Sequence, residues 1–384
     1  MQADFHYYAT YCAAVIAGYS HEEALTLAYS DQFVDCCTRT FLKSISATPH
    51  AATSQTQAEL VDARADVLGL QDITRIWASF HFLPRDLNAA TPRATKTYKN
   101  KYRLICGPNG SLVSDTVELA KGKGLQAAGL AMHIVSDTWA HMYFAGTPSL
   151  VINNTSNDFF EILPDGEMRK IKFKHSPGAS DDIEDYTYNN TVFNPSETNI
   201  LNLGHGHAGH LPDYSFARYR YLPAWGGYNE YLKDNPSDYY KAFCQMVYAM
   251  KYLRGAAEHF ELDTYDEEAV RPYSERIDAV LTRRQADASD DWKAFGEELS
   301  GKTIPDFDMA AYAEEYKSAS PDVRDDTFIG RFILAALSQK SMVTNKIYRS
   351  GNTLAGVSID YNKKGFGGIK DYMKLVAGDT GVRS

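Results

Sequence analysis

The N-terminal part of the chain shows hydrophobic positions at helical spacing. Residues 7–17 are an apolar, alanine-rich run that ends at Gly18, which is typical of a helix followed by a C-terminal glycine. Ser20, followed three residues later by Glu23, is the capping-box pattern and predicts a second helix that extends to about Cys37. We expect the two runs to form a pair of antiparallel helices.

Helical patterning continues through the chain, interrupted by loops. After a loop of small and polar residues, residues 57–70 return to helical composition, and residues 88–97 form another loop. Residues 112–143 are expected to form one or two long helices that end near Gly146. Further helices are predicted in the C-terminal third at residues 239–259, 263–285, 289–299, 308–317 and 324–345.

A different pattern begins at about residue 148. Residues 159–163 are largely apolar, Pro164-Asp165-Gly166 is a turn sequence, and residues 168–173 alternate in polarity. This succession predicts a β-hairpin. The fold class is therefore expected to be mainly α, a multi-helix bundle with a small β-hairpin insertion.

Composition and charge exclude several functional classes. The chain has 384 residues and a formal net charge of -10, with its lysines and arginines scattered, which disfavours nonspecific binding to nucleic-acid backbones. It shows neither an apolar run of about 18 residues nor the basic start and apolar core of a signal peptide. Five cysteines without zinc-ribbon spacing suit a reducing compartment. We expect a soluble, cytoplasmic protein, with export by a route without a cleaved signal as the alternative.

Three potential metal ligands lie four residues apart in the predicted long helix: His133, Asp137 and His141. Each step of four residues turns a helix by about 400°, so the three side chains share one face. Their neighbours are mostly apolar, and burying two imidazoles and a carboxylate is costly unless a partner satisfies them. A divalent cation does so with nitrogen and oxygen donors. The alternative is a row of core residues bonded to the backbone or to water.

One helix cannot close a metal site, so further ligands must come from elsewhere in the chain. The candidates are polar groups in apolar or glycine-rich surroundings: Asp4 and His6, Asp35, His81, and the segment 204–213 with His205, His207, His210 and Asp213. In the alternative, Asp4 and Asp35 cap helices, His81 is a satisfied core histidine, and the later histidines lie in a solvated loop. We predict the following metal ligands: His6, Asp35, His81, His133, Asp137, His141 and His205.

The positions of these ligands along the chain suggest how its domain is organised. Residues 1–147 are expected to form a helical metal-binding core, residues 148–203 a β-containing insertion, and residues 204–384 the completion of the site with C-terminal helices. The three parts are expected to form one domain overall.

These motifs resemble those of the zinc-dependent phospholipase C and single-strand nuclease superfamily over roughly the first 215 residues. The chain is more closely similar to an uncharacterised group of bacterial proteins that share Asp-Phe-His at the N-terminus, Phe-His-Phe-Leu-Pro, Asp-Thr-Trp-Ala-His, and Gly-His-Gly followed by Pro-Asp. The superfamily resemblance implies an α-helical fold and up to three zinc ions that hydrolyse phosphoesters. By motif, His133 and Asp137 match its His-x-x-x-Asp pair, His6 its early His, Asp35 its bridging carboxylate, and His81 the His that follows.

The chain departs from the superfamily pattern at three points. The superfamily uses the amine of a mature N-terminal Trp as a ligand, whereas this chain begins with Met1 and shows no cleavable leader. Three residues separate Asp137 from His141, where five are usual. The late His and carboxylate are usually separated by three residues, and neither His205 nor His210 has that spacing to Asp213.

The predicted function is metal-dependent hydrolysis, most simply by a zinc-dependent phosphoester hydrolase that uses a metal-activated water. Asp35 is expected to act in catalysis as well as in binding, and Asp4 or Asp213, if left free, to orient the water or protonate the leaving group. Acidic residues such as Asp62 or Asp66 are candidates to orient the ligands. The alternatives are a nuclease of the same superfamily, a non-catalytic helical interaction module with structural metal, and an amide hydrolase. The last is disfavoured because His21-Glu22-Glu23 lacks the second His of a metalloprotease helix.

The expected substrate is a small or lipid-like phosphoester. The tyrosine-rich segment 214–231, with Arg218, Arg220 and Trp225, forms either a pocket for a base or an apolar tail, or part of the core. The sequence has no strong signature of nucleic-acid or membrane binding. A homo-oligomer or a protein partner stays open.

Overall fold

The computed structural model describes residues 1–48, 54–58, 70–91, 95–147, 152, 155, 158–174, 180–190 and 204–352. Within them the fold is mainly α, as the periodicity predicts. Most of the predicted 57–70 helix, including Asp62 and Asp66, lies outside the described residues.

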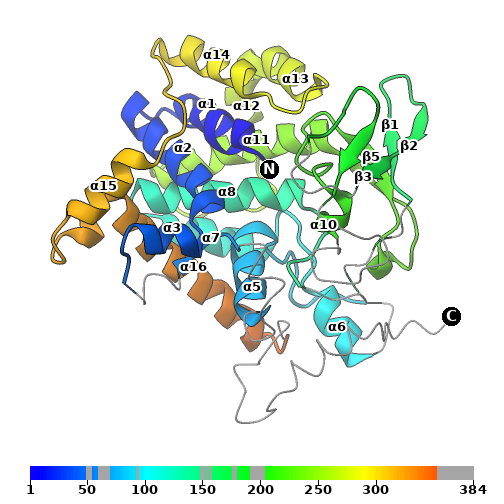
Figure 1. Ribbon diagram of the computed structural model, residues 1–384, viewed down its shortest axis with the longest axis horizontal. Helices are drawn as coiled ribbons and strands as arrows, with labels where there is room; N and C mark the ends of the chain where they lie inside the picture. The colour runs from blue at the N-terminus through cyan, green and yellow to red at the C-terminus, as the bar shows by residue number, and fades with distance from the viewer. Residues whose placement is uncertain are drawn as a thin grey trace.

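The central element is α8 (Leu125–Ala140), which crosses the middle of the molecule (Figure 1). All of its residues from Gln126 to Ala140 are buried, as expected for a helix that neighbours surround on every side. The predicted 112–143 segment is thus two helices, since α7 (Ser111–Ala120) precedes α8. The helices packed around α8 are α2 (His21–Cys36), α7, α11 (Asn235–Leu253) and α16 (Phe328–Arg349).

The close packing of α2 against α8 depends on a glycine. A Cβ atom at Gly129 would lie 2.3 Å from the carbonyl oxygen of Leu27 and 2.6 Å from the Cβ atom of Ser30. Only a residue without a side chain allows this approach, which sets Asp31 and Asp35 of α2 opposite His133 and Asp137 of α8.

The predicted N-terminal helix pair is confirmed. The first helix begins as a π-helical turn, η1 (Asp4–Ala9), and continues as α1 (Thr10–Ile16). The capping box at α2 is present, because Glu23 N donates to Ser20 Oγ and Ser20 N donates to the Glu23 carboxylate. The shorter elements that follow are α3 (Arg39–Ser44), α5 (Leu70–Ile76), the π-helical turn η3 (Trp77–His81) and α6 (Lys96–Tyr102).

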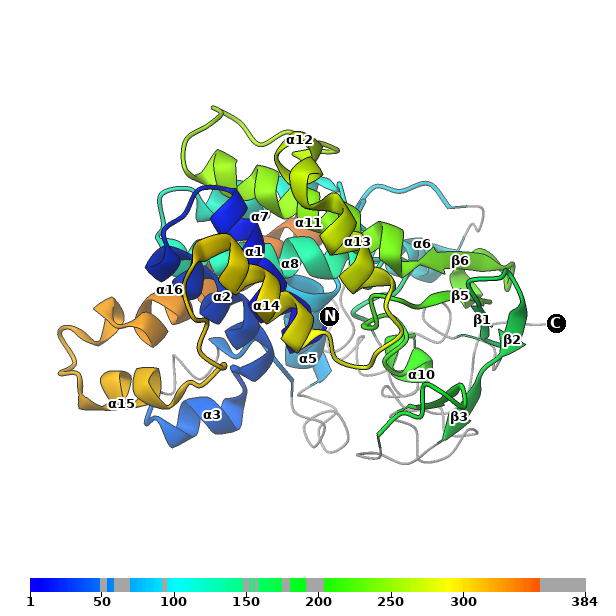
Figure 2. The ribbon, with the colours of Figure 1, turned by 90° about the horizontal axis from the view of Figure 1, so that it is seen from above.

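The predicted hairpin is also confirmed, and its sheet extends beyond the 148–203 segment. Strands β1 (Phe160–Ile162) and β2 (Met168–Lys170) are antiparallel, with Ile162 opposite Met168. β5 (Arg218–Tyr221) and β6 (Tyr231–Asp234) join them in the order β2-β1-β5-β6. A separate parallel pair is formed by β3 (Lys172–Lys174) and β4 (Thr187–Asn189). The strands lie on one side of the helices, opposite α15 (Figures 1 and 2).

The C-terminal helices follow the predicted order, with two differences. The predicted 239–259 helix, α11, begins at Asn235 and ends at Leu253. The 263–285 segment is divided into α12 (Glu267–Val270), the 3-10 turn Arg271–Tyr273 and α13 (Ser274–Thr282). The division falls at Pro272, whose ring nitrogen cannot donate a helical hydrogen bond. The remaining elements are α14 (Ser289–Ser300), α15 (Ala310–Ser318) and the 3-10 turn Arg324–Asp326 before α16.

Three hydrophobic clusters lie in the interior of the described part of the chain. The largest joins α8 to the surrounding helices, the smaller cluster lies under the sheet, and a third consists of Tyr98, Ala145 and Ile152. Tyr219 and Tyr221 are fully buried in the smaller cluster, so this part of the tyrosine-rich segment belongs to the core. Among the described residues, no helix is both long and apolar enough to cross a membrane.

Candidate metal centre

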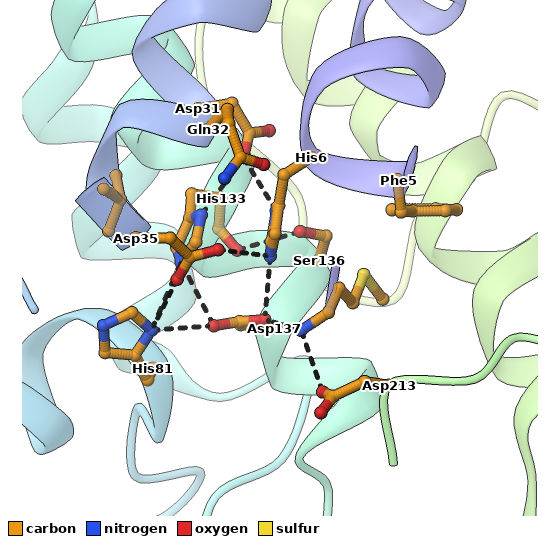
Figure 3. A network of polar contacts seen from close by, with 12 residues as sticks. Phe5, His6, Asp31, Gln32, Asp35, His81, His133, Ser136, Asp137 and Asp213 are labelled. Atoms are coloured by element: carbon orange, nitrogen blue, oxygen red, sulfur yellow. Dashed lines mark hydrogen bonds and ion pairs between the residues drawn. The ribbon is translucent and has the colours of Figure 1, made fainter. Parts of the chain in front are cut away.

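The helices bring most of the predicted ligands into one buried cluster (Figure 3). Two of the segments that carry them, η1 with His6 and η3 with His81, are π-helical turns, a rare geometry that is frequent at functional sites. α2 and α8 contribute the other members. We call this group the helical set: His6, Asp31, Asp35, His81, His133 and Asp137.

His133 lies at the centre of the helical set. Its Nε2 atom is 3.3 Å from His81 Nδ1 and 3.2 Å from Asp137 Oδ2. Two groups of potential donors share this histidine, one with His6 and Asp31 and the other with Asp35 and His81. In each group, one ligand atom from every residue lies within 4.8 Å of the others.

The ring of His6 has close neighbours but lacks hydrogen bonds. Its Nδ1 atom is 2.8 Å from Asp31 Oδ1 and its Nε2 atom is 3.3 Å from Asp137 Oδ1. Among the described residues, neither nitrogen has a hydrogen-bond partner of acceptable geometry, although the side chain is fully buried. Unsatisfied buried nitrogens beside carboxylates fit side chains arranged around a shared cation.

A second group of donors lies where α8 ends and the segment 204–213 approaches it. We call it the junction set: His141, His205 and Asp213. The Nε2 atoms of His141 and His205 are 3.3 and 3.2 Å from Asp213 Oδ1, and one ligand atom from each of the three residues lies within 4.8 Å of the others. The backbone of this segment is held close to the end of β4 at Gly209, where φ is 61° and a Cβ atom would lie 2.3 Å from Asn189 O.

The α-amine of Met1 lies between the two sets. It donates to Asp137 Oδ1 at 2.9 Å, and it is 3.2 Å from Asp213 Oδ1. Met1 is buried, and the N-terminus lies inside the molecule beside α8 (Figure 1). Once deprotonated, the amine would be a further nitrogen donor next to Asp137, whose other oxygen faces His81 and His133.

Hydrogen bonds from the other ring nitrogens fix three of the imidazoles. Thr56 O is 2.9 Å from His81 Nε2, and His81 O is 2.7 Å from His141 Nδ1. Asp31 Oδ1 is 3.1 Å from His133 Nδ1, and the same carboxylate accepts from Thr10 Oγ1 at 2.6 Å. When these nitrogens donate, the opposite nitrogen of each ring presents a lone pair to the cluster, which is the arrangement typical of metal-binding histidines.

The carboxylates favour positive charge within the cluster. Burial alone would lower the pKa of His133, but Asp137 and Asp35 outweigh it and raise this pKa to about 10. Burial is likewise outweighed at the Met1 amine, where Asp137 and Asp213 raise the pKa to about 11. At His141 burial prevails and lowers the pKa to about 4, so this ring is neutral at pH 7.

The two carboxylates beside the Met1 amine are ionised. Burial would raise the pKa of Asp137, but His141, the Met1 amine and His133 hold it well below its usual value. His205 and the Met1 amine do the same for Asp213.

The cluster is buried on one side and reaches solvent on the other. The side chains of His6, Asp31 and His133 have an exposed fraction of zero. The side chain of Asp35 is 24 % exposed and that of His205 is 22 % exposed, so each set has one donor at the surface. Asp35 is therefore the most exposed member of the helical set and His205 that of the junction set.

Some predicted residues take other positions. Asp4 was predicted to be a free catalytic carboxylate, but its oxygens accept from the backbone nitrogens of Phe5 and Ala288. Burial raises the pKa of Asp4 to about 6. The Asp4 side chain lies on η1 and points to the start of α14. Its contacts therefore do not support the predicted catalytic role.

Asp213 is not free either, because the junction histidines and the Met1 amine surround it. Asp137 and Asp35 both face the two donor groups, since Asp35 Oδ2 is 3.9 Å from His6 Nε2 and Asp35 Oδ1 is 3.8 Å from His81 Nδ1. The bridging role that the resemblance implies for Asp35 stays a prediction. Outside the cluster, His210 pairs with Asp181, and His207 stacks on Phe159.

Sequence reasoning missed two members of the cluster, Asp31 and the Met1 amine. Asp31 lies one helical turn before Asp35, so the same spacing rule that grouped His133 with Asp137 could have found it. Only the resemblance pointed to the Met1 amine, because the superfamily uses an N-terminal amine as a metal ligand.

A family model matches residues 1–347, and the chain therefore belongs to that family, which is described as a family of unknown function (DUF6765). No curated protein and no solved structure matches the chain. The resemblance to the phospholipase C and nuclease superfamily stays a prediction.

Proposed function

We propose that this member of a family of unknown function is a metal-dependent hydrolase, most simply a zinc-dependent phosphoester hydrolase with a phospholipase C-like bundle. One observation carries the proposal: the two donor groups of the helical set meet at His133, and Asp137 presents one oxygen toward His6 and the other toward His81 and His133. Ions held by the two groups would be neighbours, which is the arrangement of two-metal hydrolytic sites.

The donor chemistry fits zinc. The cluster offers imidazole nitrogens and carboxylate oxygens, the ligands that Zn²⁺ accepts, and it offers no thiolate among the described residues. No lysine or arginine of the described chain forms an ion pair with Asp31, Asp35, Asp137 or Asp213. Among the described residues the Met1 ammonium pairs with Asp137 and Asp213, while Asp31 and Asp35 have no ammonium or guanidinium partner. Two or three divalent ions would supply further positive charge.

The residues of the chain would divide the work as follows. Asp31, Thr56 O and His81 O hold His133, His81 and His141 in fixed orientations. Bound zinc would supply an electrophile for a phosphoryl oxygen and a water of lowered pKa. Asp35, the most exposed member of the helical set, is placed to accept a proton from that water.

The substrate proposed is a small or lipid-like phosphoester. The acidic exterior and the half-buried cluster suit a compact substrate better than a long nucleic acid, and a nuclease of the same superfamily is the nearest alternative. A non-catalytic module with structural metal is the second candidate, and the complete burial of His6, Asp31 and His133 favours it.

Hydrolysis of chromogenic esters by zinc-loaded protein tests the proposal. We expect turnover of bis(4-nitrophenyl) phosphate or 4-nitrophenyl phosphate that chelation abolishes and zinc restores. Asp35→Asn should lower kcat by at least about 100-fold because it removes both a donor and the proton acceptor. His259→Ala, which changes an exposed histidine outside the cluster, is the matched control and should retain full activity. Full zinc occupancy without hydrolysis of either ester would favour the structural-metal alternative.

A further inference from the structure

A second feature of the helical core is an apolar groove on the opposite half of α8 from the metal ligands. It has a volume of about 200 Å³ and lies between α7, the first turns of α8, and α16. Its floor is formed by side chains that are nearly or fully buried: Thr116, Ala120, Ala127, Leu130 and Gln339. Leu119, Leu334 and Ala335 form its apolar walls.

The mouth of the groove carries positive charge in a protein whose net charge is -10. Lys123 and Arg331 both line it. The ammonium of Lys123 makes no ion pair with any described residue, and Arg331 has only a 3.8 Å contact with the exposed Asp326. Leu334, between these cations and the floor, is 48 % exposed, which is unusual for a large apolar side chain. An apolar groove with Lys123 and the loosely paired Arg331 at its mouth complements an amphiphile with an anionic head.

The groove is connected to the elements that carry the helical set. Leu130 lies three residues before His133 on α8. Gln339 Nε2 donates to Thr116 Oγ1 at 2.9 Å and to Ser79 O at 3.2 Å, and Ser79 belongs to the π-helical turn that ends at His81. A ligand in the groove would thus contact Leu130, on the helix that carries His133, and Gln339, which is bonded to the turn that carries His81.

We propose that this groove binds a medium-chain carboxylate, with its alkyl chain against Leu130 and Leu334 and its carboxylate between Lys123 and Arg331. The volume sets the chain length, since a dry cavity of about 150 Å³ holds one benzene molecule and about 200 Å³ therefore suits roughly six to eight carbon atoms. The site is separate from the proposed hydrolytic function and does not depend on it.

Calorimetric titration of the full-length protein with butanoate, hexanoate, octanoate and decanoate tests the chain length. Each added pair of methylene groups should tighten binding by roughly tenfold up to octanoate and by less beyond it. Octylammonium, with the same chain and the opposite charge, should bind at least several-fold more weakly than octanoate. Absence of octanoate binding to folded protein, or equal binding of octylammonium, would overturn the proposal.

Variants on α16 locate the site. Ala335→Phe fills the groove and should abolish octanoate binding, whereas Ser341→Phe, at an exposed position of the same helix, should not change it. Arg331→Gln should weaken octanoate binding by up to about fivefold, and Arg349→Gln, which removes the same charge at the exposed end of α16, should leave it unchanged.

If Ala335→Phe fails to fold, Leu334→Gln replaces it. Position 334 is exposed and so tolerates a polar side chain, and the substitution removes the leucine that forms part of the apolar wall. Octanoate binding that neither wall variant weakens would contradict the assignment. Light scattering tests whether the groove instead pairs two copies of the chain. A change in molecular mass on substitution of Ala335, with octanoate binding unchanged, would also contradict the assignment.

Discussion

The helical set and the junction set use the same kinds of side chain in different settings. The helical set comes from helices or helical turns, and its innermost members have no exposed surface. The junction set combines a residue at the end of α8 with a short segment whose backbone turns at Gly204 and Gly209. We infer that packing of long helices prearranges the first set, whereas the second depends on how a loop approaches the helices.

The largest effect that would separate the two sets is expected from His133→Ala. This substitution removes the imidazole at the centre of the helical set, so zinc affinity there should fall by more than about 100-fold. His141→Ala is the matched change in the junction set and should leave the helical set loaded. Native mass spectrometry counts the ions in each variant. Loss of the same zinc ions from both variants would contradict the division of the donors into two separate sets.

A smaller effect is expected from Asp31→Asn. Asp31 Oδ1 accepts from His133 Nδ1, and the amide keeps the size of the side chain while removing its charge. Substitutions of such orienting partners lower metal affinity by about 10-fold to 100-fold. Competition with a zinc chelator measures the change. Unaltered affinity would show that Asp31 does not orient His133.

The pH dependence of zinc binding should differ between the sets. The pKa of His133 is raised to about 10, so in metal-free protein this ring holds a proton throughout the neutral range and zinc must displace it. Binding to the helical set should therefore tighten by about tenfold per pH unit between roughly pH 6 and 9 for this one proton. His141 has a pKa of about 4 and is already neutral, so it adds no such slope to the junction set. Proton release measured by calorimetry in buffers of different ionisation enthalpy checks this, and a release unaffected by His133→Ala would contradict it.

The smallest effect on metal binding is expected from the glycines that position each set. Gly129→Ala forces α2 away from α8 and should lower the free energy of unfolding by about 1–3 kcal/mol, with a several-fold loss of zinc affinity in the helical set. Gly209→Ala, which is strained at φ 61° and meets Asn189 O, should weaken the junction set instead. Thermal unfolding and zinc titration of both variants measure this. If the two glycines affected the same ions, the sets would not be independent.

The same contrast explains what the sequence could predict. His133, Asp137 and His141 were identifiable because a period of four residues puts them on one face of a helix, and the capping box at Ser20 marked the start of α2. The β-hairpin was identifiable because its turn is local. The pairing of β1 with β5 joins residues that are distant in the chain, so no local sequence pattern predicts it.

The misplaced and missed residues have physical reasons of the same kind. Asp4 and His6 are two positions apart on a helical turn, so they cannot face the same side, and only His6 reaches the cluster. The Met1 amine enters the cluster because η1 packs against α2, which is a tertiary contact. His205 and Asp213 meet because the backbone of the 204–213 segment turns at Gly204 and Gly209, and the number of residues between them does not by itself fix that geometry.

The most direct test of the account is the metal content of the purified protein, measured by inductively coupled plasma mass spectrometry beside His133→Ala and His141→Ala. We predict about two or three zinc ions in the unaltered protein, with loss of the helical-set ions in the first variant and of a single junction ion in the second. A protein that binds no zinc after reconstitution, or that keeps its full zinc content in both variants, would contradict the central claim that these histidines and aspartates form a metal centre.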